Sequence, residues 1–115
     1  VVHGDDDVRI GDNVVIGHKV LCHAKTVGDR VLLGNGAIIN DGVTIGNDSL
    51  LASGTMVIDN MNIPSKSIVM GVPGRVRGTI ESRHLDLIKY YGDEYVQKAI
   101  RYMNQGGLES KILEL

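Results

Sequence analysis

Three of the four histidines in this sequence fall within its first 23 residues, at His3, His18 and His23. Three neutral imidazoles that leave a fourth position open form a typical catalytic zinc site. An ion in such a site lowers the pKa of a bound water to about 7 and so generates a hydroxide nucleophile near neutral pH. The three residues therefore suggest a metal site that activates water, provided that a fold brings their rings together.

Aliphatic residues recur every six positions through most of the chain, which points to a repetitive fold. With one five-residue step, the series runs through Ile10, Ile16, Cys22, Val27, Leu33, Ile39, Ile45, Leu51, Val57, Ile63 and Val69. Gly usually follows, and Phe and Trp are absent, so the core must be narrow. A short strand and a corner every six residues close a triangular coil of about 18 residues, and coils stack about 4.8 Å apart. The pattern predicts an all-β parallel β-helix of hexapeptide coils over residues 1–78.

The rest of the chain has a different pattern. Apolar residues recur at three- and four-residue spacing, which predicts an amphipathic helix; they include Leu85, Ile88, Val96 and Ile100. We expect residues 79–115 to form a helical segment that packs on a flank of the β-helix or on a neighbouring subunit, with the helix ending at Gly106–Gly107. Gly92 costs about 1 kcal/mol relative to Ala in a helix. The sequence leaves open whether the helix is continuous, kinked or broken there.

The six-residue register assigns the three histidines to two corners of the coil. The residues before His3 and His23 occupy the same edge of successive coils, once an acidic loop over residues 4–7 bulges outward. The two rings should therefore stack about 4.8 Å apart at one corner. His18 lies at the preceding corner, and its ring points elsewhere. A monomer cannot easily assemble all three rings, whereas a threefold assembly places the His18 corner of one subunit against the His3/His23 corner of the next.

These segments resemble the gamma class of carbonic anhydrases. The resemblance covers nearly the whole chain and rests on Val1 to Asp5, on Ile10 to His23 with its His-x4-His spacing, on Val27 to Ile39, on Ser67 to Val76 and on Tyr95–Val96. It implies a left-handed β-helix, a homotrimer, and zinc (or iron or cobalt) at the subunit interfaces. The family's ligands match His3 and His23 on one subunit and His18 on the next. The implied reaction is the reversible hydration of CO2 to bicarbonate.

Further positions match or depart from family residues. The family has a proton-shuttle Glu after its first metal-binding His, and Asp6 is the nearest counterpart in a shorter loop. Tyr95 matches a tyrosine that approaches the site from the C-terminal helix, although a packing role suits it equally. An Arg, an Asp and a Gln of the family would lie before Val1, so we expect this sequence to be a segment or a processed product. Cys22 takes an inward aliphatic position and should be a buried structural thiol rather than a ligand.

Charge and composition narrow the class of function. The net charge is −2, from 12 basic and 14 acidic residues that are scattered, so nothing predicts binding to nucleic acid or to a membrane surface. No apolar run approaches the roughly 18 residues of a membrane span. A single cysteine predicts a reducing compartment, and hence a cytoplasmic location. The expected partners are other copies of the chain and a small-molecule substrate.

Two alternatives to an anhydrase stay open at this point. One is a trimeric metal-binding protein without anhydrase activity. The other is a hexapeptide acyltransferase, in which a histidine acts as general base on a hydroxyl or amine while an acyl-CoA lies between subunits. One histidine suffices for the acyltransferase, and the metal content separates it from the other two.

Overall fold

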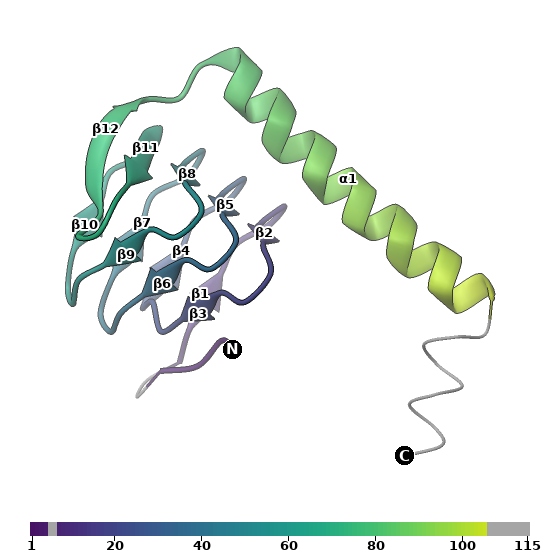
Figure 1. The fold of residues 1–115 in the computed structure, drawn as a ribbon, viewed down its shortest axis with the longest axis horizontal. Helices are drawn as coiled ribbons and strands as arrows, with labels where there is room; N and C mark the ends of the chain where they lie inside the picture. Colours follow the sequence, from purple (N-terminus) through teal and green to yellow (C-terminus); the bar gives the residue numbers. More distant parts are fainter. Residues whose placement is uncertain (5–6, 106–115) are drawn as a thin grey trace.

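The computed structural model describes residues 1–4 and 7–105, which form a parallel β-helix followed by one long α-helix (Figure 1). The strands are β1 (Arg9–Ile10), β2 (Val15–Ile16), β3 (Leu21–Cys22), β4 (Thr26–Val27), β5 (Leu32–Leu33), β6 (Ile38–Ile39), β7 (Thr44–Ile45), β8 (Leu50–Leu51), β9 (Met56–Val57), β10 (Asn62–Ile63), β11 (Ser67–Met70) and β12 (Arg75–Thr79), and the helix is α1 (Ser82–Asn104). The fold class expected from the sequence, a parallel β-helix of hexapeptide coils with a C-terminal helix, is confirmed.

Three sheets form the three faces of the β-helix. Their strand orders are β1-β4-β7-β10, β3-β6-β9 and β2-β5-β8-β11-β12, so each strand pairs with the third strand after it until the chain reaches β12. The pairing is parallel and in a constant register, in which Leu32 lies beside Leu50 and Leu33 beside Leu51. Consequently, residues about 18 positions apart lie beside one another on successive coils.

The core is a narrow column of aliphatic side chains, as the repeat predicts. Each two-residue strand from β3 to β10 buries its second residue, because successive side chains of a strand point to opposite faces. Fully enclosed members of this column are Cys22, Leu33, Ile39, Leu51, Val57, Ile63 and Val69. At the first coil the pattern weakens: Ile10 is exposed, and Ile16 is only partly buried against the core. Val15, which the register points outward, is buried as well.

The β-helix ends in a feature that the hexapeptide pattern does not contain. Strand β12 runs antiparallel to β11 and forms a hairpin with it, and Met70 pairs with Arg75 at the closed end. The hairpin covers the last edge of the β2-β5-β8-β11 sheet, which would otherwise leave a row of unpaired backbone groups. It therefore closes the stack of coils at the end from which α1 departs (Figure 1).

Helix α1 is continuous through Gly92, which settles the question that the sequence left open. A side-chain carbon at this position would lie 3.4 Å from Cγ2 of Val15, so the glycine sits where the helix approaches the first coil closely. Ile88 is the buried residue of the helix. The C-terminal part of α1 extends away from the strands (Figure 1), and Val96 and Ile100 are exposed. The predicted helix end at Gly106–Gly107 lies outside the described residues.

None of the helices in the described part of the chain has the length and apolar character needed to cross a membrane.

The coils pack so closely at their corners that a side chain added at a corner glycine should destabilise the fold. A Cβ atom added at Gly34 would lie 2.6 Å from the amide nitrogen of Ser53 and 2.7 Å from the carbonyl oxygen of Leu51, and neither backbone atom can move without separating the coils. We expect Gly34→Ala to lower the free energy of unfolding in urea by about 1–3 kcal/mol, the usual cost of overpacking.

Gly78→Ala is the matched control, because its added Cβ would come no closer than 3.7 Å to another side chain. Equal urea midpoints for the two variants would contradict this account of the corners.

Candidate metal centre

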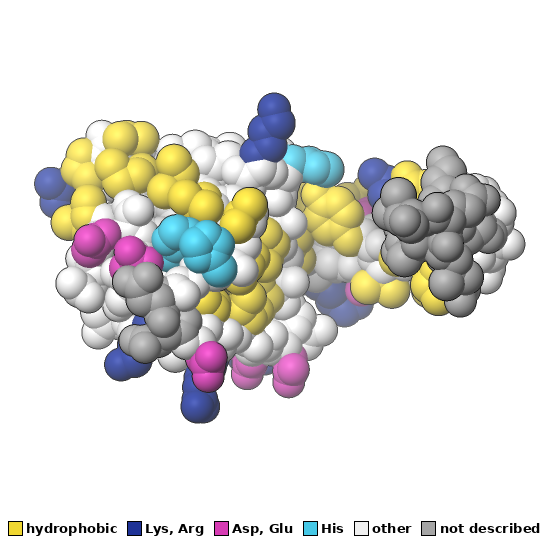
Figure 2. All heavy atoms as spheres, turned by 90° about the horizontal axis from the view of Figure 1, so that it is seen from below, with side chains coloured by type: hydrophobic (Ala, Val, Ile, Leu, Met, Phe, Trp, Pro, Cys, Tyr) yellow, Lys and Arg dark blue, Asp and Glu magenta, His cyan; other side chains and the backbone are white. Residues whose placement is uncertain are grey.

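His3 and His23 lie on successive coils at one corner of the β-helix. Val2 pairs with Cys22 in a parallel bridge, and the amide of His3 donates a hydrogen bond of 3.0 Å to the carbonyl oxygen of Cys22. This pairing places the two histidine rings with centroids 4.2 Å apart and planes inclined by 47°. Figure 2 shows a histidine patch with acidic side chains on one side of it, and a further histidine side chain apart from the patch, nearer the helix. The two rings are thus close enough to bind one ion.

The His23 ring carries the most informative polar atom of the structure. Among the described residues, its Nε2 is the one buried side-chain nitrogen or oxygen without a hydrogen-bond partner. Its Nδ1 lies 3.2 Å from Oδ1 of Asp41. A buried polar atom without a partner costs about 1–3 kcal/mol, so native proteins rarely leave one unless a ligand or a function accounts for it. An imidazole nitrogen without a hydrogen-bond partner, beside a second imidazole, fits zinc, iron or cobalt.

His18 lies apart from this pair, on the preceding corner. Its amide donates a hydrogen bond of 2.8 Å to Oδ1 of Asn35, and its carbonyl oxygen accepts one of 2.8 Å from Gly36, so the next coil fixes this corner. The exposed imidazole faces helix α1 instead, where Nε2 lies 3.4 Å from the hydroxyl of Tyr95. The two rings meet edge to face, with centroids 6.1 Å apart.

The structure therefore brings together two of the three predicted ligands and leaves the third at a separate corner. Within residues 1–4 and 7–105, no group of three or more His, Cys, Asp or Glu side chains is arranged to hold an ion inside one chain. This two-plus-one geometry is the one that the register predicts. The role of His3, His18 and His23 as ligands stays a prediction.

The remaining predicted site residues differ in where they lie. Tyr95, from the middle of α1, reaches the His18 corner. Asp6, the counterpart of the family's proton shuttle, lies outside the described residues. Asp41 is a site residue that the sequence analysis did not single out. Asp41 follows His23 by one coil of 18 positions, so the spacing that stacks the coils also predicts that the two residues are neighbours.

Cys22 is enclosed in the core directly beneath this corner. Its exposed fraction is 0%, and burial raises the pKa of its thiol above the usual range, although the backbone of Ala24 and the N-terminal amine act in the opposite direction. A soft metal ligand must be a thiolate, and burial disfavours that form here. The geometry agrees with a structural thiol.

We expect the Cys22 thiol of the folded protein to resist Ellman's reagent at pH 8 and to react fully in guanidinium. Because the pKa is raised in the folded state, the unfolded chain loses this proton first, near pH 8.5. Its contribution to stability is therefore complete below that pH and declines as the pH rises further. Rapid labelling of the native protein would show that the core is open at this coil.

Comparisons with known proteins agree with the fold and extend it to relatives. A family model described as bacterial transferase hexapeptide (six repeats) matches residues 25–59. Protein YrdA of Escherichia coli is 38% identical over 99 residues, which cover 86% of this chain and 54% of YrdA. Gamma carbonic anhydrase 1, mitochondrial, of Arabidopsis thaliana is 30% identical over 105 residues, which cover 91% of this chain and 38% of the relative.

The chain is a hexapeptide-repeat protein related to the gamma carbonic anhydrases. It spans about half the length of YrdA, and less than half of the plant relative. A solved structure described as a putative acetyltransferase from Bacillus cereus superposes with a TM-score of 0.76 and 23% identity, covering 85% of this chain and 63% of that one. At that identity the likeness shows the shared fold, and hexapeptide-repeat proteins of this fold include both anhydrases and acetyltransferases.

Proposed function

We propose that this protein catalyses the reversible hydration of CO2 to bicarbonate at metal sites shared between the subunits of a homotrimer. The observation that carries the proposal is the buried, unpartnered Nε2 of His23 beside the ring of His3. Two imidazoles do not complete a catalytic zinc site, and the third is on another corner. A threefold arrangement supplies it, because the interface between two copies is heterologous and joins two different corners.

The proposed division of labour follows from where each side chain lies. His3 and His23 of one subunit hold the ion, with His18 of the neighbouring subunit as the third ligand. A zinc ion (or iron or cobalt) held by these three imidazoles would supply Lewis acidity, which in such sites lowers the pKa of a bound water to about 7. The Tyr95 hydroxyl lies 3.4 Å from Nε2 of His18, which supports a role for it near the site. In this proposal Tyr95 would donate a hydrogen bond to a substrate oxygen, and Asp6 would be the proton shuttle.

The acyltransferase alternative accounts for fewer features of the same residues. A general base needs a single histidine within hydrogen-bonding reach of its substrate. It gives no reason for two imidazoles stacked 4.2 Å apart, or for a buried ring nitrogen without a partner. A metal-binding trimer without activity would use the same geometry, and only a rate measurement separates it from an anhydrase.

The deciding experiment measures CO2 hydration by stopped flow with a pH indicator, on protein whose metal content is known from mass spectrometry. We expect the zinc-loaded protein to accelerate hydration. His18→Ala should lower kcat/KM by about a hundredfold or more, since losing a ligand costs at least as much as losing a residue that supports one. Its zinc content should fall in parallel.

His84→Ala is the control for loss of a histidine, because His84 caps the start of α1 and lies far from the corner pair in the sequence. Full zinc occupancy without hydration would overturn the anhydrase in favour of a binding protein. Metal-free protein that transfers an acetyl group from acetyl-CoA would overturn it in favour of the transferase.

A further inference from the structure

The carboxylate of Asp41 makes one contact among the described residues, and that contact is with the ring of His23. Its Oδ1 lies 3.2 Å from Nδ1 of His23, and the carboxylate is half exposed while the imidazole is mostly covered. The Asp41 backbone supports the corner, since its carbonyl oxygen accepts a hydrogen bond of 2.8 Å from Asn60. Its side chain contacts His23 and caps no strand or turn among the described hydrogen bonds. The contact therefore acts on the imidazole rather than on the coil.

We propose that Asp41 is a positioning residue that fixes the tautomer and the orientation of His23, so that Nε2 is presented as the metal ligand. The inference rests on the proposed metal site and names a residue that the site depends on. A neutral imidazole carries one N–H donor and one acceptor nitrogen. A carboxylate can only accept, so it favours the proton on Nδ1 and leaves the lone pair on Nε2. That is the nitrogen that the structure leaves buried and without a partner.

The backbone holds the two side chains in this relation. Strands β3 and β6 pair in register, and the amide of His23 donates a hydrogen bond of 2.8 Å to the carbonyl oxygen of Ile39. Asp41 follows two residues later, at the start of the turn. Gly42, with a φ of 74°, then bends the chain at the corner. Because both residues belong to paired coils, the carboxylate reaches the ring without a long flexible arm.

The three proposed ligands are not equivalent in this respect. Among the described residues, His23 alone of the three has a carboxylate beside its ring, whereas His18 meets the Tyr95 hydroxyl. His23 is also the most enclosed of the three, as its side chain is 22% exposed. A covered ring cannot turn to correct a wrong tautomer as an exposed ring can. Asp41 acts on the ligand for which a fixed tautomer matters most.

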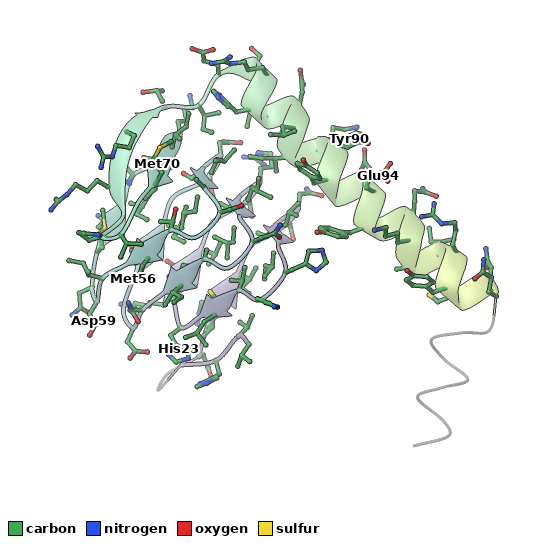
Figure 3. All side chains as sticks on the ribbon, in the orientation of Figure 1. His23, Met56, Asp59, Met70, Tyr90 and Glu94 are labelled. Atoms are coloured by element: carbon green, nitrogen blue, oxygen red, sulfur yellow. The ribbon has the colours of Figure 1, made fainter. Side chains whose placement is uncertain are left out.

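The matched pair of variants is Asp41→Asn and Asp59→Asn. Asp59 occupies the same corner one coil later, is exposed, and has no ion-pair partner among the described residues. Figure 3 shows that it lies on the same side of the β-helix as His23, away from α1. Asparagine keeps the shape of aspartate, but its amide can donate to Nδ1 as readily as it accepts. Only Asp41→Asn should therefore release the His23 tautomer.

Two measurements on the intact chain test the inference. In competition with a chromophoric chelator, we expect Asp41→Asn to weaken zinc binding by about 10- to 100-fold, the usual effect of losing a residue that orients a ligand. Asp59→Asn should stay within about twofold of the wild type. In the metal-free protein above pH 8, nitrogen-15 NMR of the imidazoles should show His23 with its proton on Nδ1. Asp41→Asn should move a substantial fraction of that proton to Nε2.

Wild-type zinc affinity in Asp41→Asn, together with an unchanged His23 tautomer, would overturn the positioning role and leave the metal site intact. Equal weakening in both variants, with unchanged tautomers, would reduce Asp41 to a structural turn residue and overturn the inference as well. If the wild type binds no zinc, the proposed function fails, but the tautomer measurement in metal-free protein still decides whether Asp41 sets the His23 ring.

Discussion

Backbone hydrogen bonds between successive coils decide which residues of this protein lie beside one another. From β1 to β11 the strands of successive coils pair in parallel, and backbone amides of one coil donate to carbonyl oxygens of the next, as when the amide of Gly34 donates to the carbonyl oxygen of Leu51 at 2.8 Å. These backbone hydrogen bonds form in the same way whatever side chains the paired residues carry. The register stacks aliphatic residues into the core. The same register places the ring of His3 beside that of His23, and the carboxylate of Asp41 beside the His23 ring. The core and the candidate site are thus two consequences of one spacing.

The same register keeps the site incomplete within one chain. The three faces of a triangular coil point in three directions, so a residue five positions before His23 cannot share its corner. His18 has a place of its own, held by Asn35 and facing Tyr95 on the helix. Under the proposed function, activity would therefore depend on assembly. The corners that carry His18 and His23 are each held by backbone contacts to the neighbouring coil, so each part of the proposed site would be ordered before assembly.

The sequence predicted the parts of this structure that follow from its period. Six-residue spacing predicted the β-helix, its aliphatic core and the separation of His18 from the other two histidines. It did not predict β12, because this antiparallel strand covers the exposed edge of the last coil and does not belong to the six-residue repeat. The sequence left the role of Gly92 open for a similar reason. The low helix propensity of glycine favours a break, but the close approach of α1 to Val15 explains a glycine in a continuous helix. The contact of Asp41 with His23 was not predicted, because aspartate is common in turns and its presence there does not by itself indicate a histidine neighbour on the preceding coil.

The central claim is that each metal site takes His18 from one copy and His3 and His23 from the next. Co-expressed His18→Ala and His23→Ala chains with different tags yield mixed trimers after two affinity steps. Around a ring of heterologous interfaces, each mixed trimer contains a single interface with all three imidazoles, so it should bind about one third of the wild-type zinc, whereas either parent binds almost none. Mixed trimers with no more zinc than the parents would contradict the claim.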